Sequence, residues 1–347
     1  MINELALRDY LQSAFPDVKE IAIRKLGSGV QGSGFLVSMC SAGLCKAYVV
    51  KTLFPEGLGH DYPSDRAGVF LLDLDEYNNM PRHVRALDVL AELEEGRVKS
   101  IGGGKEYYLL MEVADGVDYF KDLEAFRNKD KLDAADKSRI IAMTSYLARI
   151  HSAKKESRSL YLRKIRDTIG HGECLMGVFD TYPDGTLSAA EMAEIEKMCI
   201  DWRARLRDKT HRLSMIHGDF HPGNIWFKSD DDFILLDRSR GPWGEPADDV
   251  TAMAINYIFF SLRYYGDVRG AYLEGLTLFF DEYLRLTGDG EILAVLAPFF
   301  AFRGVVVANP VFYPDVSLDA RSRIFVFVKN VLSEKNFDCA EVNRYIL

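Results

Sequence analysis

The stretch 215–237, MIHGDFHPGNIWFKSDDDFILLD, holds three oxygen-bearing side chains whose spacing suits shared chemistry. Asn224 begins one apolar run and Asp237 ends a second, and the polar turn KSDDD joins the two runs. Folded as an antiparallel hairpin, the runs bring Asn224 beside Asp237. Asp219 lies a few residues upstream, in a loop that contains Gly218, Pro222 and Gly223. We therefore expect the three side chains to converge.

Phosphoryl transfer requires such a set of side chains. Mg²⁺ prefers oxygen ligands, so a carboxylate and an amide oxygen suit it together with nucleotide phosphates. A separate carboxylate must accept the proton of the attacking hydroxyl group. The sequence thus predicts Asp219 as the base and Asn224 and Asp237 as the metal ligands.

The same stretch allows a second interpretation, a metallohydrolase. His217, Asp219 and His221 have side chains that could bind zinc. No His-rich cluster elsewhere in the sequence completes such a site, so we favour the phosphoryl-transfer hypothesis.

Residues 26–34 read LGSGVQGSG, with glycines at Gly27, Gly29 and Gly32. A dinucleotide-binding fingerprint would need a helix next, but residues 35–40 have the composition of a strand. A GxxxxGK[ST] phosphate loop is absent from the sequence. A strand, a glycine loop and a second strand fit a flap over the phosphates of ATP, although a plain hairpin turn has the same pattern.

Lys51 ends the apolar run AYVV in an expected buried strand. A buried ammonium group needs an anionic partner, which the α- and β-phosphates of ATP and a helix carboxylate would supply. We choose Glu76 as that carboxylate, and Asp73 and Asp75 are the alternatives. A strand-end lysine that reaches solvent is the competing explanation.

The order of elements predicts two lobes. An amphipathic helix comes first, and residues 21–53 are expected to form three antiparallel strands. Residues 61–93 are expected to be mostly helical, with a break at Pro81. Residues 97–101 and 107–113 are expected to form two more strands, joined by the turn at 102–104. Helices follow, including 132–153 and one that opens with a capping box at Ser188 and Glu191. We predict an α+β protein with a five-stranded lobe, 1–113, and a helical lobe, 114–347.

Composition and charge restrict the function. The chain has 347 residues, a globular balance of 48% apolar and 27% charged residues, and a net charge of −9. This charge argues against broad binding to nucleic acid or anionic membranes. The longest apolar stretch, 292–302, is too short to span a bilayer. Cys40 and Cys45 flank a turn and could form a bridge, but we expect the five cysteines to be free thiols in the cytoplasm.

The motif HGDFHPGN, with an Asp at a strand end thirteen residues later, resembles the catalytic loop and metal-binding segment of the aminoglycoside phosphotransferase and choline kinase superfamily. The resemblance implies the bilobal protein-kinase-like fold and the roles given above for Asp219, Asn224 and Asp237, with His217 bracing the loop. Asp249 would match the acid that holds this loop through backbone hydrogen bonds, with Asp248 as its rival. Ser239 stands where many relatives carry a second acid, which leaves open whether one or two metal ions bind.

The resemblance extends to the nucleotide and acceptor sites. The segment YYLLMEVADG, 107–116, is similar to the strand and hinge that bind adenine, through the carbonyl of Glu112 and the amide of Ala114. The acceptor site is expected in the helical lobe, whose many Phe and Tyr side chains between 255 and 313 we interpret mostly as core. The acids Glu173, Asp180 and Asp184 would suit a cationic acceptor there, or they are solvated loop residues.

We therefore predict an enzyme that uses ATP and Mg²⁺ to phosphorylate a hydroxyl group of a small molecule such as an aminoglycoside, choline, a sugar or an amino alcohol. A protein-directed kinase is disfavoured because only eleven residues separate Asp237 from Asp249, too few for an activation segment. A nucleotide-binding pseudoenzyme has no need for Asp219, Asn224 and Lys51 together with Asp237. The identity of the acceptor, the choice between ATP and GTP and the oligomeric state stay open.

Overall fold

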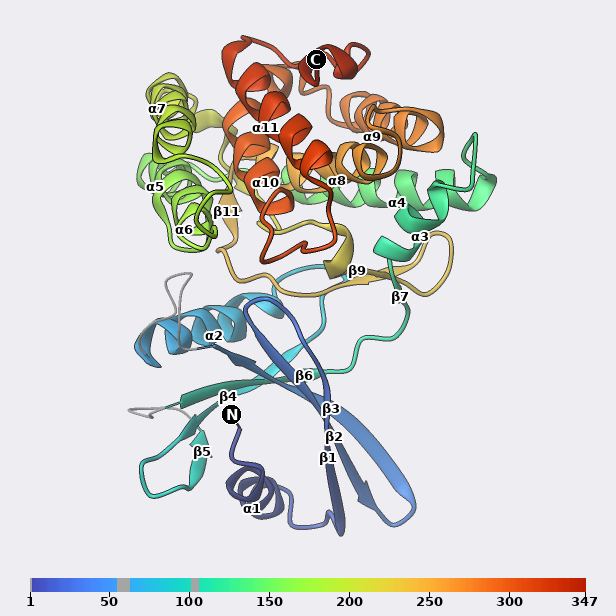
Figure 1. Ribbon diagram of the computed structural model, residues 1–347. Helices are drawn as coiled ribbons and strands as arrows, with labels where there is room; N and C mark the ends of the chain where they lie inside the picture. Colours follow the sequence, from blue (N-terminus) through green and yellow to red (C-terminus); the bar gives the residue numbers. More distant parts are fainter. Residues whose placement is uncertain (1, 55–62, 101–105) are drawn as a thin grey trace. The chain divides into compact units, whose positions relative to one another are not determined.

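The computed structural model describes residues 2–54, 63–100 and 106–347, and the chain divides into two compact units. Unit 1 comprises Met1–Asp115 and Ile234–Ser239, and unit 2 comprises Gly116–Phe233 and Arg240–Leu347 (Figure 1). The first division falls two residues after the predicted lobe boundary. The return of Ile234–Ser239 to unit 1 was not expected from the sequence. The predicted turn at 102–104 lies outside the described residues.

Unit 1 is built on an antiparallel sheet of six strands in the order β1-β2-β3-β6-β4-β5. The predicted first helix forms as α1 (Glu4–Ala14), and α2 follows β3. The other elements are β1 (Glu20–Ser28), β2 (Gly32–Ser41), β3 (Leu44–Leu53), α2 (Pro63–Tyr77), β4 (Ala86–Glu92), β5 (Val98–Ser100) and β6 (Glu106–Glu112). The strands predicted in 21–53, 97–101 and 107–113 are confirmed.

Strand β4 was missed, because we expected 61–93 to be mostly helical. The helix ends at Tyr77, and the chain turns at Arg82, which has a positive φ of 62°. The segment ALDVLAE then pairs along β6 and buries Val89, Leu90 and Ala91 completely. Ala, Leu and Glu favour helices, but burial against a neighbouring strand outweighs this weak local preference.

Each face of the unit 1 sheet packs against one helix (Figure 1). Leu7 and Leu11 of α1 pack with Leu90 and other strand residues in one apolar cluster, and Phe70 of α2 packs with Val89 in the other. Neighbouring residues of β4 thus enter different clusters, as the alternation of side chains along a strand requires. The result is a three-layer unit with the sheet in the middle.

A disulfide joins Cys40 and Cys45, which face each other where β2 and β3 end in their connecting turn. The prediction of free thiols is therefore wrong for this pair. The register of the hairpin places the two residues opposite each other, close enough for the bond. Cys174, Cys199 and Cys339 are free thiols, as predicted.

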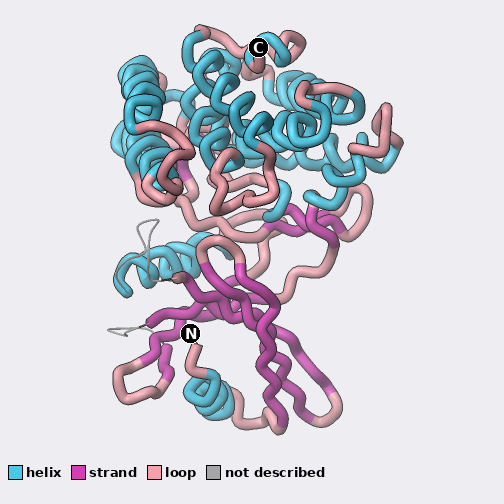
Figure 2. Tube along the Cα trace, in the orientation of Figure 1, coloured by secondary structure: helices cyan, strands magenta, loops and turns pink. Residues whose placement is uncertain are grey.

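Unit 2 is mostly helical (Figure 2). Its α-helices are α3 (Phe120–Phe126), α4 (Ala134–His151), α5 (Arg158–Gly170), α6 (Leu175–Phe179), α7 (Ala189–Leu206), α8 (Ala247–Tyr265), α9 (Gly270–Thr287), α10 (Ala297–Val307) and α11 (Leu318–Ser333). Short 3-10 helices are η1 (Thr210–Arg212), η2 (Pro222–Asn224), η3 (Gly290–Ala294) and η4 (Val342–Tyr345). The predicted capping box of Ser188 and Glu191 opens α7, and the preceding insert, 156–187, contains α5 and α6.

The remaining strands form two small sheets. One has the order β10-β9-β7 and the other pairs β11 with β8. Their bounds are β7 (Val117–Asp118), β8 (Ser214–Met215), β9 (Ile225–Phe227), β10 (Phe233–Leu235) and β11 (Trp243–Gly244). The adjacency of β9 and β10 confirms that the two apolar runs of 215–237 are neighbouring strands.

Helix α8 is the core of unit 2, because its residues from Ala247 to Leu262 are buried on all sides. Tyr257, Tyr272, Phe279 and Phe280 are each at most 1% exposed, which confirms that most aromatic side chains of this region are core. In the described ranges, no helix is long and apolar enough to cross a membrane.

The glycines of the β1–β2 turn differ in how much space surrounds them, and this difference generates a prediction. A Cβ atom on Gly32 would lie 1.8 Å from the carbonyl oxygen of Thr52, whereas a Cβ on Gly29 would meet nothing within 4 Å. Because the obstacle is backbone, Gly32→Ala must push β2 away from β3. We expect it to cost about 1–3 kcal/mol of stability. A thermal unfolding curve measures this loss.

The matched control is Gly29→Ala, which should change the melting temperature by much less. An equal effect of the two substitutions would contradict the predicted clash at Gly32.

Candidate functional site

The loop that contains Asp219 follows β8 and is held by a buried carboxylate at the start of α8. Asp249 Oδ2 accepts the backbone N–H of His217 at 2.7 Å, and Oδ1 accepts that of Gly218 at 2.7 Å. Asp249, and not its rival Asp248, therefore makes the predicted loop-holding bonds. Gly218 has a φ of 88°, a left-handed conformation that glycine adopts without strain.

Asp249 is fully buried and has a second layer of support. His151 Nε2 lies 3.1 Å from Asp249 Oδ2, and His151 Nδ1 lies 2.8 Å from the hydroxyl oxygen of Tyr283. Burial by itself would raise the pKa of Asp249, but the hydrogen bonds and charges of His151 and His217 outweigh it and lower the pKa. The carboxylate is consequently ionised at neutral pH.

Hydrogen bonds between residues close in the sequence close the loop itself. The backbone N–H of Asp219 donates to His217 Nδ1 at 3.3 Å, and Asn224 Nδ2 donates to the carbonyl oxygen of Asp219 at 3.0 Å. His221 Nδ1 accepts the backbone N–H of Gly223 at 3.1 Å. The structure thus brings the predicted base Asp219 and the predicted ligand Asn224 into one small loop, with His217 buried behind it.

Two arginines contact the carboxylate of Asp219, and neither was predicted. Arg303 of α10 places Nη1 2.5 Å from Asp219 Oδ1 and donates through Nη2 to the Gly218 carbonyl at 2.9 Å. Arg240 places Nη1 3.5 Å from the same Oδ1. Burial tends to raise the pKa of Asp219, but the charges of Arg240 and Arg303 outweigh it and hold this pKa well below its ordinary value.

Further buried charges surround these arginines. Asp248 contacts Arg303 Nη2 at 2.6 Å and Lys164 Nζ of α5 at 2.5 Å. Glu173, between α5 and α6, lies 3.8 Å from Arg240 Nε. The six side chains, three cationic and three anionic, form a network that we call the Asp219 cluster: Lys164, Glu173, Asp219, Arg240, Asp248 and Arg303.

One feature of the sequence could have revealed part of this cluster. Arg303 stands in an otherwise apolar helix, APFFAFRGVVV, and a charge that must be buried there requires a partner. Arg240 ends the run Arg238-Ser239-Arg240, whose spacing predicts a missing acid at Ser239 but no role for the arginine. Lys164, by contrast, lies in an ordinary amphipathic helix and gave no indication of its role.

Several of the predicted site residues lie in unit 1. Lys51 Nζ lies 2.8 Å from Asp237 Oδ1, and Asp237 has a φ of 55°, a strained conformation for a residue with a side chain. Glu76 pairs with Arg238 Nη1 at 3.2 Å. The pairing of Lys51 with Glu76 stays a prediction.

The remaining predicted positions lie in unit 1 where the sequence placed them. The N–H of Gly29 donates to the carbonyl of Gly32 at 2.9 Å, so the glycine segment is a tight turn between β1 and β2. Gly27 lies within β1. Glu112 ends β6, and Ala114 follows it in an irregular segment. Their roles toward a nucleotide stay predictions.

The zinc hypothesis receives no support from the geometry. Within residues 2–54, 63–100 and 106–347, no three His, Cys, Asp or Glu side chains group as metal ligands. His217 and His221 instead use Nδ1 for backbone hydrogen bonds.

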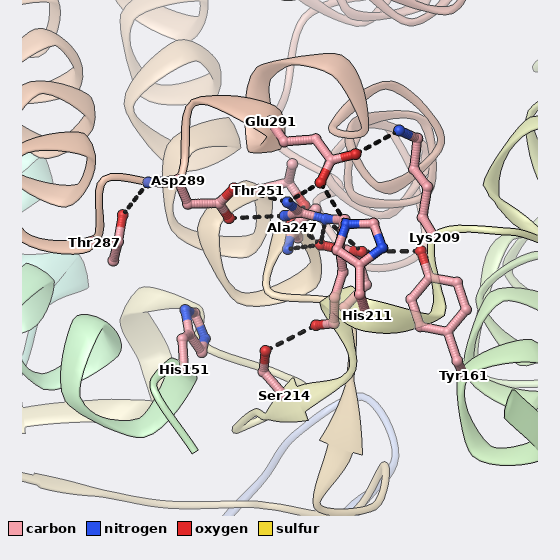
Figure 3. Close-up of polar contacts among 12 residues, drawn as sticks. His151, Tyr161, Lys209, His211, Ser214, Ala247, Thr251, Thr287, Asp289 and Glu291 are labelled. Atoms are coloured by element: carbon pink, nitrogen blue, oxygen red, sulfur yellow. Dashed lines mark hydrogen bonds and ion pairs between the residues drawn. The ribbon is translucent and has the colours of Figure 1, made fainter. Parts of the chain in front are cut away.

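A second polar network fixes the segments on either side of the candidate loop (Figure 3). Arg212 of η1 donates to Glu245 at 2.8 Å and to Asp289 at 2.7 Å. Lys209 and His211 both contact Glu291, at 2.6 and 2.8 Å. Because Glu245 precedes α8 and Arg212 precedes β8, this network ties the start of the loop to the helix that carries Asp249.

The Asp249 contacts generate a prediction with a defined pH dependence. We expect Asp249→Asn to cost about 3–5 kcal/mol, because it leaves buried N–H groups poorly paired. A group whose folded pKa is lowered contributes stability above its unfolded pKa, near 4, and loses that contribution as pH falls. The difference in melting temperature between the two proteins should therefore be constant from pH 6 to 8 and shrink below about pH 4.

Asp267→Asn is the control, since the side chain of Asp267 is 44% exposed and its carboxylate pairs only with Arg269 among the described contacts. It should change stability by less than about 1 kcal/mol. A difference for Asp249→Asn that grew on acidification would contradict the assignment.

The chain is similar to a known protein family and to solved structures. The model of the family described as "Phosphotransferase enzyme family" matches residues 72–286, more than half of the chain. No curated protein matches the sequence significantly.

Solved structures with a similar fold cover nearly the whole chain. A thermostable mutant of the aminoglycoside phosphotransferase APH(4)-Ia is 15% identical, with a TM-score of 0.54 over 94% of this chain and 98% of its own. The ethanolamine kinase of Plasmodium vivax is 11% identical, with a TM-score of 0.55 over 96% and 82%. The choline kinase of Cryptosporidium parvum is 12% identical, with a TM-score of 0.51 over 99% and 91%. These likenesses show a kinase-like fold, and the family match shows that the chain belongs to the phosphotransferase enzyme family.

Proposed function

We propose that this protein is an ATP-dependent kinase that transfers the γ-phosphate of ATP to a hydroxyl group of a small molecule. The observation that carries the proposal is the buried, ionised carboxylate of Asp219 in a loop whose backbone is held by Asp249. Membership of the phosphotransferase family supports it. So do similar structures that contain ADP with hygromycin B and GDP with kanamycin.

Asp219 is the proposed base. In the reaction, the acceptor oxygen forms a bond to the γ-phosphorus while the bond from that phosphorus to the β-bridging oxygen breaks, and ADP leaves. The proton of the acceptor hydroxyl passes to the Asp219 carboxylate. His217 is a positioning residue, since its Nδ1 accepts the N–H of Asp219. A rigid loop suits a reaction in which catalysis rests on positioning and electrostatics.

Asn224 and Asp237 are the proposed ligands of Mg²⁺. The Nδ2 of Asn224 is used on the Asp219 carbonyl, which leaves the amide oxygen to contact a metal. Asp237 supplies a carboxylate, and its positive φ is the kind of strain that occurs at functional sites. Bound Mg²⁺ would neutralise charge on the phosphates of ATP.

Unit 1 supplies the proposed nucleotide contacts. Lys51 would bind the α- and β-phosphates, with Asp237 beside its ammonium group at 2.8 Å. The turn with Gly27, Gly29 and Gly32 would cover the phosphates, and its small residues permit close approach of the backbone.

Adenine would hydrogen-bond to the carbonyl of Glu112 and the amide of Ala114, and Glu76 would help to position Lys51.

The proposal includes a cytoplasmic location, where ATP is available, although the Cys40–Cys45 disulfide is of a type found mainly in oxidising compartments.

Nucleotide binding is tested by thermal shift. Mg·ATP at 100 times its Kd should stabilise the protein by about 2.7 kcal/mol. EDTA should remove most of this shift, because the phosphates then lack the metal that joins them to Asn224 and Asp237. A shift of the same size in EDTA would contradict the role of magnesium.

Turnover is tested by ADP release across aminoglycosides, choline, sugars and amino alcohols. With the best acceptor, Asp219→Asn should lower kcat by about 10²–10⁴-fold and keep the Mg·ATP thermal shift. Asp208→Asn, whose side chain is 93% exposed, is the matched control and should turn over normally. Full turnover by Asp219→Asn would eliminate Asp219 as the base.

A further inference from the structure

Arg240 holds its charge beside the proposed base without satisfying its own hydrogen-bond donors. Its side chain is 10% exposed, and its contacts to Asp219 and Glu173 are long, at 3.5 and 3.8 Å. Its Nε and Nη1 atoms are buried and have no hydrogen-bond partner in the described part of the chain. A guanidinium group has five N–H donors in a planar fork. Donors of Arg240 that have no partner could therefore form hydrogen bonds to an additional anion.

Of the two arginines beside Asp219, Arg240 is better suited than Arg303 to bind an additional anion. The Arg303 side chain is 5% exposed and already binds Asp219, the Gly218 carbonyl and Asp248 at 2.5–2.9 Å. It neutralises the base and fixes its position. Arg240 is more exposed, is bound less tightly, and packs with its Cζ 5.2 Å from the centre of the Phe302 ring.

The same cluster is poorly suited to a cationic acceptor. Asp248 and Glu173, the other two carboxylates of the cluster, already lie near cationic side chains. Asp248 contacts Arg303 and Lys164, and Glu173 lies near Arg240. Asp180 and Asp184, the other acids considered for a cation, are exposed. The idea that acids of the insert bind an amine therefore finds no support next to the proposed base.

We propose that Arg240 binds an anionic group of the acceptor, a carboxylate or a phosphate, and so selects hydroxy acids or phosphorylated alcohols as substrates. This inference rests on the proposed kinase function. An oxyanion paired with Arg240 lies within a few ångströms of Asp219, because the two side chains are 3.5 Å apart. A hydroxyl group one or two carbons from that anion then faces the base, and the transfer reaction itself is unchanged.

The γ-phosphate of ATP has the same chemistry as a phosphorylated acceptor, so the test must separate the two sources. A non-hydrolysable ATP analogue, AMP-PNP with Mg²⁺, fills the place of the γ-phosphate. Thermal shift is then measured on the loaded protein with D-glycerate and glycerol 3-phosphate, and with glycerol, choline and kanamycin as their neutral and cationic counterparts.

We expect the two anions to raise the melting temperature and the other probes to leave it unchanged. Arg240→Gln should weaken the apparent affinity for the anions at least 10-fold while changing the Kd of Mg·AMP-PNP less than 3-fold. Arg240→Lys keeps the charge but loses the planar fork, so it should recover part of the shift. If Arg240→Gln does not fold, Arg240→Lys is measured in its place. Arg285→Gln, on the surface of α9, is the matched control and should behave as wild type.

Each other outcome overturns the inference. No shift from either anion removes the acceptor site, and a shift with choline or kanamycin assigns a cationic acceptor instead. An equal loss of AMP-PNP affinity in Arg240→Gln would show that Arg240 serves the nucleotide. Failure of Mg·AMP-PNP itself to stabilise the wild type would count against the kinase proposal, and so the two failures are distinguishable.

Discussion

A buried carboxylate that binds two backbone amides is the interaction on which the candidate site depends. Asp249 reaches from the first turn of α8 to the N–H groups of His217 and Gly218, and His151 holds it from behind. Taking a carboxylate out of water is costly unless hydrogen bonds replace the solvent, and here several do. The loop is therefore fixed to a helix whose residues 247–262 are all buried. Asp219 follows Gly218 directly, so its backbone is held in place as well.

The Asp219 cluster shows how three positive and three negative side chains can be buried together. Each charge lies near an opposite one, so the cluster is close to neutral, but its contacts are unequal. Arg303 binds tightly and Arg240 loosely. A lowered pKa makes Asp219 a weak base, which a loose, largely dissociative phosphoryl transfer tolerates, since orientation of the hydroxyl group matters more than its full deprotonation. The loosely held arginine is the part of the cluster available for recognition.

Unit 1 combines a rigid frame with local strain. Helices on both faces bury the sheet, and α2 covers the face to which Val89 and Leu109 point. Within this frame Asp237 has a left-handed backbone and lies next to Lys51. Such a conformation persists only where the surrounding structure imposes it. The short return of Ile234–Ser239 into unit 1 provides that environment.

Features set by neighbours in the chain were predictable from the sequence alone. The loop of Asp219 and Asn224, the strands beside it, the glycine turn and the cap of α7 follow from short-range spacing and turn chemistry. Tertiary structure decided the rest, because it depends on burial between distant segments. Packing against β6 made β4 a strand despite its helix-forming residues, and hairpin register paired Cys40 with Cys45. The charges around Asp219 come from α5, α8, α10 and the loops that carry Glu173 and Arg240. Coulomb energy is set by distance in space, which spacing along the chain does not reveal.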